Sequence, residues 1–141
     1  MAVQELQKST FKHIEAEWYR YHDTLKEIEN LRQEIIHSKN NPDENVGGGR
    51  SNIPGQPTER IATRLTTHKK LKYLEEIVQA IQMVYNTLPD EYKKLVRLKF
   101  WSRNRQLTWD GVALELNVSK RQAMRWRDEI IQATGEVLGW R

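Results

Sequence analysis

The chain contains no cysteine. Disulfide bridges, thiolate nucleophiles and cysteine-bound metals are therefore excluded, and a reducing compartment is compatible with the composition. Long apolar runs are also missing, since none approaches the ~20 residues that span a bilayer. The first residues lack the apolar core of a secretory signal. We therefore expect a soluble, cytoplasmic protein without a membrane partner.

Recognisable catalytic patterns are missing as well. The four histidines, His13, His22, His37 and His68, show no spacing typical of metal ligands. Acidic residues such as Asp110 suit helix starts and exposed faces better than an acid–base pair or a two-metal nuclease site. A phosphate-binding P-loop is excluded because no Lys-Ser/Thr pair follows the glycine run. The sequence thus predicts no enzyme, no cofactor and no metal site.

Positive charge is unevenly distributed along the chain. The formal net charge is +4. Residues 90–141 hold 11 Lys and Arg against 7 Asp and Glu, whereas residues 1–89 hold 12 of each. The excess therefore lies in the C-terminal part, as expected when this part contacts a polyanion.

Residues 107–131 are typical of two short helices joined by a tight corner. Thr108 is placed to cap the first helix. Asn117 stands where the chain must turn, because asparagine readily adopts the left-handed conformation that ends many helices. Ser119 is placed to cap the second helix. This arrangement predicts a helix-turn-helix that binds DNA.

The second of these helices has an apolar side and a basic side. Ala123, Trp126 and Ile130 recur at intervals of three and four and predict a buried seam. The opposite side then faces outward in the first turns, where a recognition helix meets base edges. A solvated basic face is the alternative, but the caps, corner and seam together favour DNA. The predicted base-reading residues are Lys120, Arg121, Met124 and Arg125.

A second group of residues is expected to contact the phosphate backbone. Its members lie at the two helix starts, on the basic helix, or in the connector before the pair, where a solvated loop is the alternative. They are Ser119, Arg127, Arg103, Arg105, Thr108 and Trp109.

Further helical signals flank this pair. Leu88-Pro89-Asp90-Glu91 is typical of a helix start, with proline and acidic residues in the first turn. An apolar stripe follows up to Phe100 and predicts a third helix that packs on the pair. Downstream, Gly135 or Gly139 is expected to end the basic helix, and Val137 is expected to be buried.

Two apolar seams mark the N-terminal half. The first, in residues 11–35, predicts one long helix capped by Ser9 or Thr10. The second, in residues 61–88, predicts another long helix capped by Thr58. Two such helices should pair, within one chain, across a dimer or against the C-terminal part.

The segment between the two seams, residues 38–57, is rich in Gly, Pro, Asn and Ser and predicts a loop. Its glycine run offers backbone N–H groups for an anion contact, with an arginine beside it. A flexible connection carrying one cation is the alternative, and the composition favours it. The residues of the possible anion contact are Gly47, Gly48, Gly49 and Arg50.

Two family resemblances follow from these segments. LPDEYKKLVRLKFW, followed by LTWDGVALELNVSKRQAMRWRDEI, resembles region four of bacterial sigma factors. Nearly the whole chain, including VGGGR, resembles the RinA family of phage transcriptional activators, which is related to the ArpU regulators. The sigma-like resemblance assigns base reading to Lys120, Arg121, Met124 and Arg125. The RinA resemblance implies that the protein binds a phage promoter in a bacterial host and activates late or packaging genes without catalysis.

We therefore expect an all-α protein with two domains. Residues 1–88 form a long-helix hairpin for oligomerisation or partner contact, and residues 89–141 form a sigma-region-four-like helix-turn-helix unit. The expected partners are double-stranded DNA, a second copy of the chain in a dimer, and, as a further candidate, host RNA polymerase. Two alternatives stay open: a phage terminase small subunit that recognises a packaging site, and a polymerase-binding adaptor with weak DNA specificity.

Overall fold

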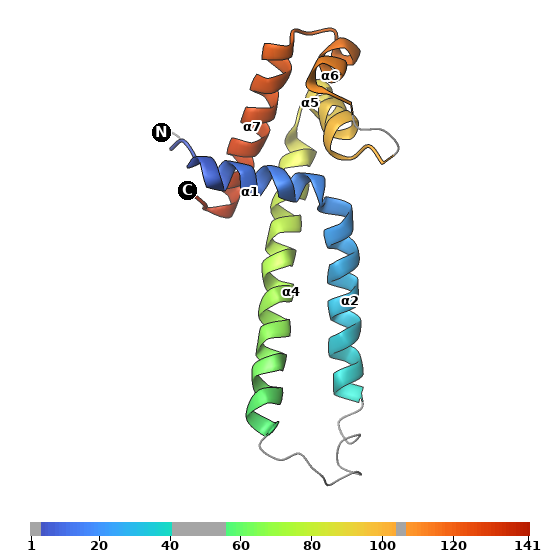
Figure 1. Ribbon diagram of the computed structural model, residues 1–141, viewed down its shortest axis with the longest axis vertical. Helices are drawn as coiled ribbons and strands as arrows, with labels where there is room; N and C mark the ends of the chain where they lie inside the picture. Colours follow the sequence, from blue (N-terminus) through green and yellow to red (C-terminus); the bar gives the residue numbers. More distant parts are fainter. Residues whose placement is uncertain (1–3, 41–55, 104–106) are drawn as a thin grey trace. The chain divides into compact units, whose positions relative to one another are not determined.

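The regular elements of the protein are helices throughout residues 4–40, 56–103 and 107–141, which the computed structural model describes (Figure 1). The expected all-α class is confirmed. No helix within these ranges carries an apolar stretch of the length needed to cross a membrane. In chain order the elements are α1 (Lys8–Tyr19), α2 (Tyr21–Asn40), α4 (Gln56–Thr87), α5 (Asp90–Leu95), the π-helical turn η1 (Val96–Phe100), α6 (Trp109–Leu116) and α7 (Lys120–Leu138).

The chain divides into two compact units. Unit 1 combines Met1–His22 with Ile77–Arg141, and unit 2 is Asp23–Glu76. The structure therefore corrects the expected boundary between residues 88 and 89, because α1 and the last turns of α4 belong with the C-terminal helices. A sequence pattern could not reveal this division, since the residues that pack together are far apart in the chain.

The core of unit 1 is centred on Trp18 of α1, whose side chain is 0% exposed. Its indole N–H donates to the hydroxyl of Thr134 at 3.0 Å, and its ring lies 6.0 Å from that of Phe100. Helices α1, α4, α5, α6 and α7 and the turn η1 add further fully buried side chains, which together remove a large apolar area from water. These are Ile14, Ile77, Ile81, Leu95, Val96, Val112, Ile130 and Ile131.

A break at Arg20 separates α1 from α2, so the expected single helix over residues 11–35 is wrong. Arg20 ends α1 with φ −93° and ψ 5°. At the same point, the carbonyl of Trp18 accepts the indole N–H of Trp101 at 3.0 Å. A side chain 83 positions away thus binds the backbone at the break. Apolar periodicity carries no information about such a contact.

Several helix ends also differ from expectation. Helix α1 is capped at Gln7 without a side-chain hydrogen bond, rather than by Ser9 or Thr10. Helix α4 begins at Gln56, so Thr58 lies inside its first turn instead of capping it. Proline at position 57 is compatible with that start, because the first N–H groups of a helix have no intrahelical partner.

The remaining helices of unit 1 end largely as expected. Helix α5 follows Pro89, with acidic residues in its first turn, and continues into η1. Helix α7 ends at Gly139, whose φ is 75°. Gly135 instead lies buried inside α7, where an added Cβ would meet the side chain of Leu6 at 2.8 Å. Val137 is exposed rather than buried.

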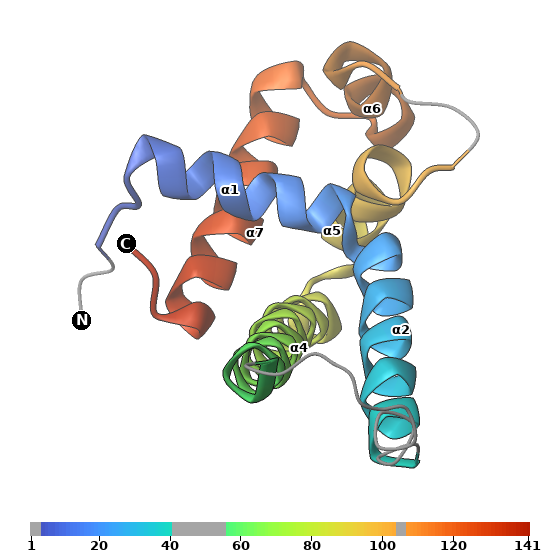
Figure 2. The same cartoon turned by 60° about the horizontal axis from the view of Figure 1, so that its bottom comes forward.

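Unit 2 consists of residues of α2 and α4 that lie side by side (Figures 1 and 2). Two ion pairs join these two arms, as we call the α2 and α4 segments of unit 2: Arg32 to Glu75 at 2.7 Å and Glu27 to Lys70 at 2.9 Å. Both pairs are substantially exposed, and exposed pairs contribute at most about 1 kcal/mol each. Apolar burial between the arms comes mainly from Ile28, Leu31 and Leu74.

Candidate nucleic-acid interface

The corner between α6 and α7 has the caps and the turn that the sequence predicts. The Thr108 hydroxyl accepts the Gly111 N–H at 3.1 Å, and the Ser119 hydroxyl accepts the Gln122 N–H at 3.0 Å. Asn117 adopts the left-handed conformation, with φ 58° and ψ 42°. These local features set how α7 leaves α6.

Small and β-branched side chains allow α6 and α7 to pack closely. Ala113 and Val112 of α6 and Ala123 and Ile130 of α7 are buried. The buried side of α7 leaves its opposite side outside the core. Because α7 is amphipathic, this outer side is the one that carries its basic residues.

Trp126 lies at the edge of this core, not inside it. Its side chain is partly exposed and stacks on Tyr92 at 4.9 Å. The Tyr92 hydroxyl donates to the Glu129 carboxylate. Burial, reinforced by this hydrogen bond, raises the pKa of Tyr92 to about 12.

The predicted base-reading residues lie together on the outer side of α7. Lys120, Arg121 and Arg125 are exposed, and Met124 is partly buried between them. With Arg127 and Asp128 they line an open hollow of about 650 Å³. Lys120 approaches Asp110 at 3.9 Å. Within the described ranges, Arg121 and Arg125 have no ion pair or hydrogen bond, so their guanidinium groups are available to a ligand.

Arg127 has a different environment. Its side chain is only 18% exposed, and its guanidinium lies over the rings of Phe11 at 5.2 Å and Trp109 at 5.5 Å. It also pairs with Asp128 at 2.8 Å and with Glu15 at 3.6 Å. Arg127 therefore connects α7 to α1 and α6 in the free protein. Its predicted phosphate contact stays a prediction.

A family model described as "Protein of unknown function (DUF722)" matches residues 17–136. The chain belongs to the DUF722 family. Comparison with curated proteins and with solved structures finds no significant match. The DUF722 match extends over α6, the Asn117 corner and nearly all of α7, so the basic surface lies inside the family region.

The other predicted phosphate-contacting residues of this DUF722 chain are dispersed around α6. The hydroxyls of Thr108 and Ser119 are exposed while they cap their helices. Trp109 is partly buried, with Lys99 5.3 Å from its ring centre. Arg103 is exposed.

Two predictions fall on parts of the chain whose structure is not described. Arg105, a predicted phosphate contact, lies outside the described residues. The same holds for the predicted anion contact, which comprises Gly47, Gly48, Gly49 and Arg50. In the described ranges, no group of three or more His, Asp or Glu side chains is arranged to hold a metal ion.

Sequence reasoning missed the participation of α1 in this region. Phe11 and Glu15 of α1 contact Arg127. They are more than 100 positions away from it in the chain, so no local spacing links them. The sequence signal of this segment is its amphipathic pattern, which predicts a helix with an apolar side but not the element that this side contacts.

Proposed function

We propose that this protein binds double-stranded DNA sequence-specifically, with α6 and α7 acting as a sigma-region-four-like helix-turn-helix. The observation that carries the proposal is the outer side of α7, where Arg121 and Arg125 project beside Lys120. Arginine can donate two hydrogen bonds to guanine in the major groove, and Met124 offers apolar contact to a thymine methyl. A DNA-binding site needs cations that are not neutralised by carboxylates of the same chain, and Arg121 and Arg125 meet this condition in the described ranges.

We further propose that the protein acts without catalysis as a phage transcription regulator, and as an activator of late or packaging genes. The resemblance of the chain to the RinA family supports this part. Fold alone does not establish function. The net charge of +4 and its concentration in residues 90–141 agree with a polyanionic partner.

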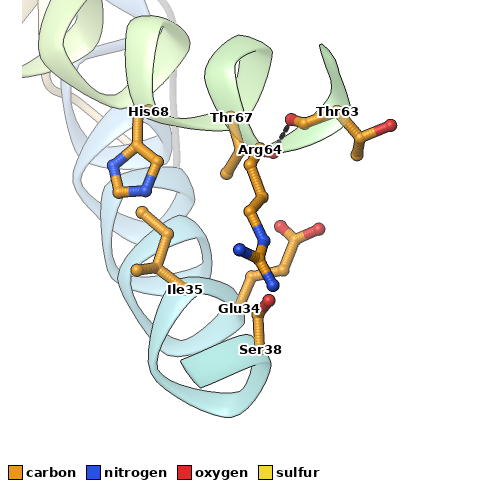
Figure 3. A pocket seen from close by; sticks show the side chains of 7 residues that line it. All are labelled: Glu34, Ile35, Ser38, Thr63, Arg64, Thr67 and His68. Atoms are coloured by element: carbon orange, nitrogen blue, oxygen red, sulfur yellow. Dashed lines mark hydrogen bonds between the residues drawn. The ribbon is translucent and has the colours of Figure 1, made fainter. Parts of the chain in front are cut away.

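We propose a homodimer formed through unit 2. In this unit, Ile61 is 59% exposed and Leu65 is 65% exposed, although both belong to the apolar seam of α4. In the same unit, residues of α2 and α4 line a hollow of about 380 Å³, in which Ile35 of α2 faces His68 of α4 (Figure 3). A C₂ interface uses the same patch on both subunits. In such a dimer, Ile61 and Leu65 of one copy would be covered by the same region of the second copy. Host RNA polymerase is the alternative occupant.

The DNA proposal is tested by selecting bound duplexes from a random pool, first at low and then at higher salt. We expect an enriched motif that survives the salt increase, since nonspecific phosphate contacts weaken steeply with salt. Arg121→Ala should lose about 1–3 kcal/mol on the motif and relax its sequence preference at one position.

Arg20→Ala is the matched control, because Arg20 is exposed at the end of α1 and does not line the hollow on α7. It should retain the motif and its affinity. Equal losses on the motif and on random DNA would refute base reading by Arg121. Absence of any motif would refute the proposed function, and a closed ring of many subunits would favour packaging-site recognition by a terminase small subunit.

A further inference from the structure

One face of α1 carries two lysines near Arg127 of α7. Phe11, Lys12 and Glu15 lie three, four and seven positions after Lys8, so the four residues share a face. With Arg127 they line a hollow of about 390 Å³. Lys8 and Lys12 are both exposed.

This hollow adjoins the one on α7. Arg127 lines both, so the α1 face and the outer side of α7 form one continuous surface within unit 1. Two residues of the same α1 face contact Arg127: Phe11, which lies between the two lysines, and Glu15, which follows them. The lysine face of α1 is therefore the one that adjoins Arg127 of α7.

The position of α1 is held firmly by the core. Ile14 and Trp18 of the same helix are 1% and 0% exposed. Trp18 also donates to Thr134 of α7 at 3.0 Å. Because these contacts are buried, α1 does not need to be ordered by a ligand, and its lysines are already in place.

The charges of the joined surface favour a polyanion. Its lining holds six cations and three carboxylates, and two of the carboxylates, Glu15 and Asp128, are paired with Arg127. Glu5 is the third. The cations other than Arg127 are Lys8, Lys12, Lys120, Arg121 and Arg125.

We propose that Lys8 and Lys12 bind phosphates of the duplex next to the bases read by α7, so that α1 is a second DNA-contacting element. This inference rests on the proposed function. Lysine neutralises phosphate as a point charge without reading sequence, so these contacts should strengthen binding to every duplex alike.

The test compares the wild-type chain with Lys8→Gln/Lys12→Gln on the selected motif over a range of salt. Each lost phosphate contact makes the slope of log affinity against log salt shallower by about 0.9, so the double variant should lose about 1.8. The advantage of the wild type should then shrink about twelvefold between 50 and 200 mM salt. The selected motif itself should not change.

Arg20→Gln/Lys26→Gln is the control, because it removes two exposed cations that line neither hollow. It should retain the wild-type slope. If Lys8→Gln/Lys12→Gln also retains that slope while Arg121→Ala loses specificity, the role of α1 is refuted and the proposed function stands. A changed motif would likewise overturn the assignment to phosphate. Failure of the wild type to bind DNA would refute both.

Discussion

Asn117 is the non-glycine residue with positive φ in the described part of the chain. It joins α6 to α7, and the N–H of the next residue, Val118, donates to the carbonyl of Ala113 at 3.0 Å. A β-branched residue in the left-handed conformation clashes with the following carbonyl, whereas glycine and asparagine tolerate it. The corner therefore depends on the identity of one side chain.

We expect Asn117→Val to lower the free energy of unfolding by about 1–2 kcal/mol, because valine must adopt the left-handed conformation. Asn117→Gly should change it by at most a few tenths of a kcal/mol. Urea unfolding followed by circular dichroism measures both. If the two variants unfold with the same free energy, the left-handed conformation at position 117 does not restrict which side chain this position can carry.

Helices α1, α6 and α7 meet at Arg127. Its guanidinium is placed between aromatic rings of α1 and α6, and its charge is balanced by Glu15 and Asp128. Partly desolvated cation–π contacts contribute about 0.5–2 kcal/mol each. Removing the side chain also leaves Glu15 without this cation. Arg127 is therefore expected to stabilise the arrangement that presents the outer side of α7.

We expect Arg127→Ala to lower the free energy of unfolding by about 1–3 kcal/mol in the absence of DNA. Arg125→Ala is the matched control; since Arg125 is exposed, we expect a change within about 0.5 kcal/mol. Thermal unfolding of both variants decides the matter. An unchanged stability of Arg127→Ala combined with weaker binding to all duplexes would assign Arg127 to phosphate instead.

The two compact units divide the proposed work: unit 1 carries the DNA surface and unit 2 the dimer contact. One helix-turn-helix makes few base contacts, whereas two copies read two half-sites. Their centres are expected one helical turn, ~34 Å, or a multiple of it apart. If the chains pair through unit 2, a substitution that breaks the dimer should lower both the molecular mass in solution and the affinity for a double site.

We expect a dimer at micromolar concentration by light scattering, and a monomer for Ile61→Lys/Leu65→Lys, because lysine would place charge in the proposed apolar contact. This variant should bind a half-site normally and a double site weakly. Met83→Lys is the control, since Met83 is 56% exposed on the same helix but belongs to unit 1. A monomeric wild type would contradict the dimer.

The corner of the candidate interface could be predicted because each of its features depends on close neighbours. A cap bonds a backbone N–H three residues ahead, as for Thr108 and Ser119. The exposed positions Lys120, Arg121 and Arg125 follow from helical periodicity once Ala123 is buried. These interactions act within a few residues, so the order of amino acids was enough to identify them.

The place of α1, the break at Arg20 and the partners of Arg127 depend on contacts between distant segments. Trp18 meets Thr134 and Trp101, and Glu15 meets Arg127, across most of the chain. Periodicity shows that a helix has an apolar side but not which element covers it, because hydrophobic burial has no direction. The three-dimensional packing therefore assigned α1 to unit 1 and placed Lys8 and Lys12 beside α7.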